Sequence, residues 1–240
     1  MTLVAVSSVA GSPGATRFVL GVAAAWPVPS PERVVLEADP DGGRLGAELG
    51  IGVEPGLMAL ALAARSSGLT AADLVIHGAA AVGDWSVIPA PASAEQATSA
   101  LVHAAATLAS IVATDPDGRV WLVDAGRLSG RSPALPFARL ADHVVVVTAG
   151  AFPSLQLVPH RVEALRDAGC HVSVVVVEPT AWSPGELAEF VGTDVLAVLP
   201  HVSTRGTGIA AMRTSPWRPW WHRVEDAAAW LAADLPAVPS

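Results

Sequence analysis

The sequence predicts an α/β fold of three layers, in which a doubly wound and mostly parallel sheet lies between two layers of helices. Short apolar runs rich in β-branched residues alternate along the chain with alanine-rich stretches of helical character. This alternation is typical of parallel sheets covered on both faces. Two of the runs, 144–147 and 174–177, consist of valine alone, as expected of strands that are buried on both sides. A chain of 240 residues is long enough to bury such a core.

Strands are predicted where an apolar run is bounded by a turn signal, a charged residue or a glycine. The sequence Asp115-Pro116-Asp117-Gly118, for example, precedes one run, and these residue types favour a tight turn. The expected strands are 3–8, 33–37, 85–89, 119–124, 142–148, 171–177 and 194–199.

Helices are predicted in the alanine-rich stretches between these strands. Ser183, Pro184 and Glu186 are typical of a helix start, with a capping hydroxyl, a proline at the first position and an acid in the first turn. We find no linker long enough to divide the chain, so we expect one domain over 1–235 and a loose tail at 236–240. The expected helices are 16–25, 56–66, 93–113, 153–168, 184–191 and 222–234.

The composition favours a globular cytoplasmic protein. No apolar stretch reaches the ~18 uninterrupted residues of a membrane span, and the single cysteine, Cys170, favours a reducing compartment because it has no partner within the chain. The net charge of −8 argues against a protein that binds nucleic acid over its whole surface. The histidines lack the spacing of metal ligands.

The most informative segment is the loop Ala10-Gly11-Ser12-Pro13-Gly14-Ala15-Thr16-Arg17, between the first strand and the first helix. A strand, a glycine turn and a helix N-terminus direct backbone N–H groups and the positive end of the helix dipole to one point, which suits an anion. A P-loop, G-x-x-x-x-G-K-[ST], adds a lysine for the phosphates and a hydroxyl for Mg²⁺. Thr16 supplies the hydroxyl, but Ala15 stands at the lysine position and every basic residue of the chain is arginine. The expected site for the phosphates of ATP or ADP comprises Gly11, Ser12, Pro13, Gly14, Ala15, Thr16 and Arg17.

Two acidic residues follow strands that we expect near this loop. Asp39 follows the second strand, and Asp124 ends the apolar run 120–123. Ligands of open α/β sheets bind outside the carboxyl ends of the strands, so both side chains are expected to converge with the loop on one crevice. Thr16, Asp39 and Asp124 are the predicted ligands of Mg²⁺, directly or through water, because Mg²⁺ prefers oxygen ligands.

With these motifs, the chain resembles the MinD/ParA family of deviant Walker A ATPases along nearly its whole length. The family's loop, Lys-Gly-Gly-x-Gly-Lys-Thr-Thr, is similar to residues 10–17, and its acid-x-Asp segment is similar to Glu37-Ala38-Asp39. The resemblance implies that Asp39 positions the attacking water in catalysis and that Asp124 is the Walker B aspartate. Glu37 matches the first acid of this segment, but it can also be interpreted as a structural residue with no role in the site.

Both lysines of the family's loop are replaced, by Ala10 and Ala15. In the family, the first crosses the dimer interface to the partner's nucleotide and the second binds phosphate in its own chain. Loss of one hydrogen bond to a charged group weakens binding by about ten- to a hundredfold. The resemblance therefore implies a degenerate, TadZ-like member: a dimeric nucleotide-binding switch or scaffold for chromosome partition, septum-site placement or pilus assembly, with weak or absent ATP hydrolysis.

Two alternatives stay open. In one, the protein is a working ATPase in which Arg17, the only cation that we expect near the loop, or an arginine of a partner chain replaces the lysine. In the alternative interpretation, Arg17 is a solvent-exposed helix residue that does not contact phosphate. In the other, the protein keeps the fold as an interaction module without nucleotide. A dinucleotide-binding unit is a further interpretation of Gly11 and Gly14, but the G-x-G-x-x-G spacing is absent.

A segment near the C-terminus combines positive charge with tryptophan. No acid lies between Asp194 and Glu225. Basic residues with exposed aromatic rings suit a protein partner, a membrane surface or DNA. Alternatively, the tryptophans cover the last helix against the sheet while the arginines reach water. We expect a homodimer, and a protein partner at the loop face or at this segment. The residues of the segment are Arg205, Arg213, Trp217, Arg218, Trp220, Trp221 and Arg223.

Overall fold

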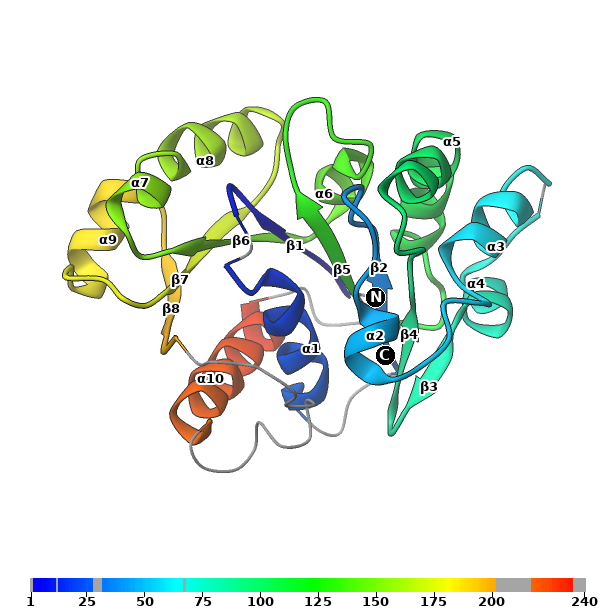
Figure 1. Ribbon diagram of the computed structural model, residues 1–240, viewed down its shortest axis with the longest axis horizontal. Coiled ribbons are helices and arrows are strands. Elements are labelled where there is room, and N and C mark those ends of the chain that lie inside the picture. The colour runs from blue at the N-terminus through cyan, green and yellow to red at the C-terminus, as the bar shows by residue number, and fades with distance from the viewer. Residues whose placement is uncertain (1, 12, 28–31, 67, 202–216, 235–240) are drawn as a thin grey trace.

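The computed structural model describes residues 2–11, 13–27, 32–66, 68–201 and 217–234. Their strands form one eight-stranded sheet in the order β3-β4-β2-β5-β1-β6-β7-β8 (Figure 1). Every neighbouring pair is parallel except β3 and β4 at one edge. The strands are β1 (Thr2–Ser8), β2 (Arg33–Glu37), β3 (Ala80–Val82), β4 (Trp85–Ile88), β5 (Val120–Arg127), β6 (His143–Ala149), β7 (Val172–Val177) and β8 (Val195–Leu199).

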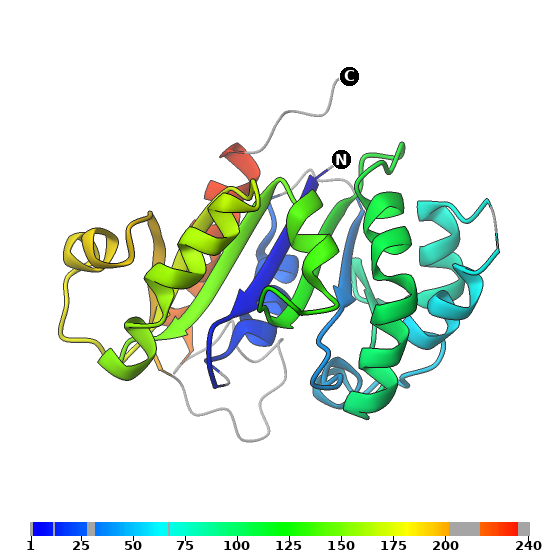
Figure 2. The same cartoon turned by 90° about the horizontal axis from the view of Figure 1, so that it is seen from above.

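Helices cover both faces of the sheet, so the expected three-layer α/β fold is confirmed. Figure 2 shows the green and yellow helices in front of the sheet and the blue and red helices behind it. One layer contains α1 (Ala15–Ala25), α2 (Leu45–Leu49) and α10 (Arg218–Asp234). The other contains α3 (Leu57–Ala63), α4 (Ala71–Gly78), α5 (Ala94–Val112), α6 (Leu135–Leu140), α7 (Phe152–Leu155), α8 (Val158–Asp167) and α9 (Pro184–Val191).

The structure differs from the predicted elements mainly in short or interrupted segments. The seven predicted strands are present, whereas β3, α2, α4 and α6 were not predicted. The single helix predicted at 153–168 is wrong, because it divides into α7 and α8. Pro159 lies in the first turn of α8, where it lacks the N–H that a continuous helix would use. α10 begins at Arg218, before the predicted start at 222.

The order of the strands brings three carboxyl ends together. β5 lies between β1 and β2, with Val6 and Glu37 both in register with Asp124. The loop that leads to α1, the segment after β2 and the end of β5 therefore leave the sheet side by side. This is the crevice in which the sequence places its candidate site residues.

The C-terminal helix is held by its tryptophans. Trp217, Trp220 and Trp221 are at most 6% exposed, and α10 packs against α1. A Cβ added at Gly21 of α1 would lie 2.7 Å from the Trp220 ring, so the two helices are in close contact. The packing interpretation of these tryptophans is confirmed, and the prediction that they form an exposed docking surface is wrong.

The arginines of that segment divide into two groups. Arg218 and Arg223 are exposed on α10, while Arg205 and Arg213 lie outside the described residues, as does the predicted tail at 236–240.

Within the described part of the chain, we find no helix with the length and apolar character needed to span a bilayer.

We expect Trp220→Ala to lower the free energy of unfolding by about 3–5 kcal/mol, because it leaves a cavity between α1 and α10. Trp230→Ala is the matched control on the same helix, since Trp230 is 36% exposed, and its loss should be less than half as large. Urea denaturation of both variants measures the difference. Equal losses would contradict the packing described for Trp220.

Candidate functional site

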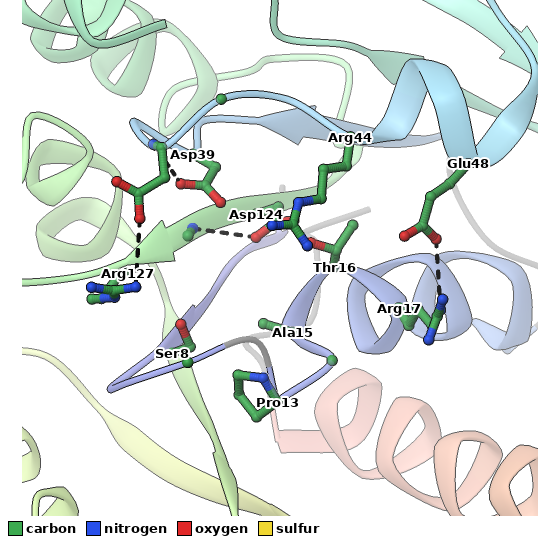
Figure 3. Close-up of a pocket in the computed structure, with 15 residues that line it drawn as sticks. Ser8, Pro13, Ala15, Thr16, Arg17, Asp39, Arg44, Glu48, Asp124 and Arg127 are labelled. Atoms are coloured by element: carbon green, nitrogen blue, oxygen red, sulfur yellow. Dashed lines mark hydrogen bonds and ion pairs between the residues drawn. The ribbon is translucent and has the colours of Figure 1, made fainter. Parts of the chain in front are cut away.

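A polar cleft of about 320 Å³ opens at the carboxyl ends of β1, β2 and β5 (Figure 3). Its size is at the lower end of the range for small-molecule sites. Side chains of both charges line it, from segments that are far apart in the sequence. The lining residues are Ser8, Gly11, Pro13, Gly14, Ala15, Thr16, Arg17, Asp39, Asp41, Gly42, Arg44, Glu48, Asp124, Gly126 and Arg127.

The glycine loop forms one wall of this cleft. Gly14 adopts a left-handed conformation, with φ 98°, which favours glycine, and its carbonyl accepts the Phe18 N–H at 2.9 Å. As the N-cap residue of α1, Gly14 has no side chain that could bond to the first N–H groups of the helix, and these groups have no partner within the helix. Of the predicted phosphate-binding residues, all but Ser12, which lies outside the described residues, line the cleft. Their binding role stays a prediction.

Asp124 lies at the base of the cleft and is 1% exposed. Its Oδ1 accepts the Gly126 N–H at 3.2 Å, whereas the buried Oδ2 has no hydrogen bond of ordinary geometry among the described residues. Burial, with a smaller contribution from the nearby charges of Glu37 and Asp39, raises the pKa of Asp124 to about 7, although the Thr16 hydroxyl and the Gly126 N–H act to lower it. A buried carboxylate oxygen without a partner is unusual and suits a cation.

The three predicted magnesium ligands, Thr16, Asp39 and Asp124, all line this cleft. Mg²⁺ in proteins is commonly held by one or two carboxylates, with water and phosphate oxygens completing its shell. The hydroxyl and the open Asp124 oxygen fit that pattern. Within the described ranges, no three acidic, histidine or cysteine side chains form a complete metal site, so the remaining ligands would come from water and a phosphate.

Asp39 is fixed against the end of β5. Its Oδ1 accepts the Asp41 N–H at 2.9 Å, and a Cβ added at Gly126 would lie 2.1 Å from this carboxylate oxygen. Gly126 is therefore required for the carboxylate to lie against the strand. Burial raises the pKa of Asp39, while the charges of Arg44 and Arg127 lower it.

Glu37 has a structural role, as the alternative interpretation proposed. The side chain is 1% exposed, and its carboxylate accepts the N–H groups of Arg44, of Leu45 at 3.0 Å and of Ala90 at 2.8 Å. Burial raises its pKa, and these three hydrogen bonds lower it. Glu37 thus joins the start of α2 to the segment after β4.

The expectation that Arg17 is the only cation near the loop is wrong. Arg44 and Arg127 also line the cleft, together with Ser8, Asp41 and Glu48, and none of these was predicted. The Arg17 Nε atom lies 3.7 Å from the Glu48 carboxylate. The sequence did contain a signal for these two arginines, because Arg44 and Arg127 lie within a few residues of Asp39 and Asp124. Only the strand order shows that both segments meet the loop.

Comparison with solved structures identifies the architecture. A ParA family ATPase from Chlorobium tepidum aligns over 95% of this chain and 98% of its own, with a TM-score of 0.78 and 16% identity. The septum site-determining protein MinD with Mg-ADP, from Pyrococcus horikoshii, aligns over 99% and 100%, with a TM-score of 0.72 and 14% identity. This is the ParA/MinD fold.

The same fold extends to a third solved protein. An ATP complex of a variant McdA from Cyanothece covers 100% of this chain and 99% of its own, with a TM-score of 0.64 and 12% identity. No protein-family model and no curated protein sequence matches this chain. Its likeness to the ParA/MinD fold is therefore one of architecture.

The buried Asp124 predicts a pH dependence of stability. Its pKa of about 7 exceeds that of an unfolded aspartate, ~3.9, so between these values the folded state holds a proton that the unfolded state releases. The free energy of unfolding of the wild type should therefore fall, relative to Asp124→Asn, as pH rises from about 4 to about 7, by roughly 4 kcal/mol at most.

Urea denaturation at several pH values, without nucleotide or Mg²⁺, measures that difference. The contributions of groups that titrate equally in the wild type and in Asp124→Asn cancel in the difference between the two stabilities. If the stabilities of the two proteins run parallel across this pH range, the assignment of a raised pKa to Asp124 is wrong.

The Glu37 hydrogen bonds predict that Glu37→Gln lowers the free energy of unfolding by about 1–3 kcal/mol, since a glutamine has only one acceptor oxygen for three N–H groups. Glu163→Gln makes the same chemical change at an exposed position of α8 and should cost far less. Thermal melts of both variants without ligand test the comparison. Equal stability of the two would argue against an anchoring role for Glu37.

Proposed function

We propose that the protein is a nucleotide-binding switch or scaffold that positions other cellular components, with ATP or ADP and Mg²⁺ bound in the cleft and with weak or absent hydrolysis. One observation carries this proposal: Asp124 is buried, its Oδ2 accepts no hydrogen bond of ordinary geometry from the described residues, and it lines the same cleft as Thr16 and the start of α1. The cleft thus offers oxygen ligands for a cation next to N–H donors for an anion. A magnesium–nucleotide complex satisfies both.

The solved neighbours support the choice of ligand and role. The MinD neighbour contains Mg-ADP and is described as septum site-determining, and the McdA neighbour contains ATP. Septum-site placement is the role named for the MinD neighbour. Chromosome partition and pilus assembly are the other processes that we propose, because of the resemblance of the sequence to the MinD/ParA family. We further propose that it acts in the cytoplasm as a homodimer that meets a protein partner through its loop face.

Each residue of the cleft has a defined task in this proposal. The N–H groups at the start of α1 face the phosphates, and Thr16 with Asp124 holds Mg²⁺, which neutralises phosphate charge. Asp39, fixed by the Asp41 N–H, is the group that orients water toward the terminal phosphate. The loop itself contributes no side-chain cation from Ala10 or Ala15, and phosphoryl transfer depends on stabilising negative charge. Hydrolysis is therefore expected to be slow.

Isothermal titration with Mg-ATP and Mg-ADP tests the proposal. We expect binding by the wild type and a loss of affinity of at least tenfold in Thr16→Ala, because the hydroxyl contacts the metal. Thr16→Ser keeps the hydroxyl and should retain binding. In thermal melts, nucleotide at a hundred times its Kd should stabilise the protein by about 2.7 kcal/mol.

Two other results would select the alternatives. Wild-type protein that binds neither nucleotide at millimolar concentration would instead be an interaction module with the ParA/MinD fold. Steady phosphate release that is lost in Asp39→Ala would identify a working ATPase and would contradict the slow hydrolysis proposed here.

A further inference from the structure

We propose that Arg44 and Arg127 bind the phosphates of the nucleotide and replace the lysine that the loop lacks. This inference rests on the proposed function, and it names the residues that make nucleotide binding possible in a chain without lysine. Arg127 ends β5, the strand of Asp124, and Arg44 lies in the segment between β2 and α2 that also carries Asp39, so neither belongs to the loop.

Arg44 is the first of these cations. It precedes α2 and its guanidinium points down into the cleft, toward Thr16 and Asp124 (Figure 3). Among the described residues, this guanidinium has no ion pair and no hydrogen bond. The backbone of Arg44 is engaged on both sides, because its N–H is held by Glu37 and its carbonyl accepts the Glu48 N–H at 2.9 Å. Five N–H donors in a planar group are thus directed at the cleft without a partner.

The backbone at Arg44 is fixed by contacts with buried residues. The buried Glu37 carboxylate holds the N–H groups of Arg44 and Leu45, and Leu45 itself is fully buried. A Cβ added at Gly43 would lie 2.3 Å from the Ala90 carbonyl oxygen, so this segment packs directly against the one after β4. A donor on a fixed backbone loses less entropy on binding than one on a mobile loop.

Arg127 is the second cation and reaches the cleft from the end of β5. Its ion pair with Asp41 has a separation of 3.8 Å, and both side chains are more than half exposed. Exposed pairs of this kind contribute little to stability, so a phosphate can replace the carboxylate at small cost. Arg44 and Arg127 both lower the pKa of Asp39, which shows that their charges act on the same part of the cleft.

Arg17 is less suited to this task. Its Nε atom makes no hydrogen bond with the described residues but lies 3.7 Å from the Glu48 carboxylate, and both side chains are about two-thirds buried. Binding a phosphate would therefore move this guanidinium away from a partly buried opposite charge. A guanidinium binds phosphate oxygens with two parallel hydrogen bonds. The open guanidinium of Arg44 satisfies this geometry without breaking another contact.

The test compares nucleotide affinity in Arg44→Ala, Arg127→Ala and the double variant by isothermal titration at fixed ionic strength. Arg65→Ala is the matched control, because Arg65 is exposed and does not line the cleft. We expect Arg44→Ala to weaken Mg-ATP binding at least tenfold, Arg127→Ala to weaken it less, and the double variant to weaken it most. Affinity for adenosine, which has no phosphate, should not change.

Each result decides a separate question. If wild-type protein binds no Mg-ATP, both this inference and the proposed function are wrong. If the wild type binds and the double variant binds as tightly as Arg65→Ala, the inference is wrong while the proposed function stands. A loss confined to Arg17→Ala would assign the phosphate to Arg17 instead. Ligand-free melting temperatures confirm that each variant is folded.

Discussion

The cleft depends on two carboxylates that are buried side by side at the ends of neighbouring strands. Glu37 and Asp124 are in register, and each is 1% exposed. Burying a carboxylate is costly unless hydrogen bonds compensate. Glu37 accepts hydrogen bonds from three backbone N–H groups, whereas no N–H of the described residues donates to Oδ2 of Asp124. One carboxylate therefore builds the site, and the other remains available to a ligand.

The segment after β2 owes its path to these contacts. Glu37 holds the start of α2, and Asp39 lies against Gly126 at the end of β5. The second wall of the cleft is thus attached to the sheet at two points. That attachment places Arg44 at the cleft, which Arg127 also reaches from the end of β5. Positive charge therefore lines the cleft although the chain has no lysine.

The tryptophan-rich C-terminal helix belongs to the same framework. α10 covers α1, the helix whose first turn faces the cleft. Two tryptophans of α10, Trp220 and Trp221, are buried in that layer, together with Trp217 just before the helix. Aromatic rings of this size contribute much of a core's stability. The segment that the sequence indicated as a docking surface thus packs its tryptophans against the helix that starts at the cleft, while Arg218 and Arg223 are exposed.

The sequence by itself determined the sheet and the chemistry of the loop. Strands such as β6 and β7 are apolar on both faces, a local pattern that is visible in the residues, and the absence of lysine is a property of the composition. The positions of Asp39 and Asp124 at strand ends follow from the same pattern, so their convergence could be predicted.

Only the tertiary structure decided what surrounds these groups. The short helix α2 and the edge strand β3 have too few residues for a clear periodicity, and the positions of Arg44 and Arg127 depend on the strand order. Whether Glu37 binds a ligand or backbone amides, and whether Trp220 faces water or α1, depends on contacts between segments far apart in the chain. Such contacts depend on how distant segments pack together, and the local pattern of residues in the sequence does not determine this packing.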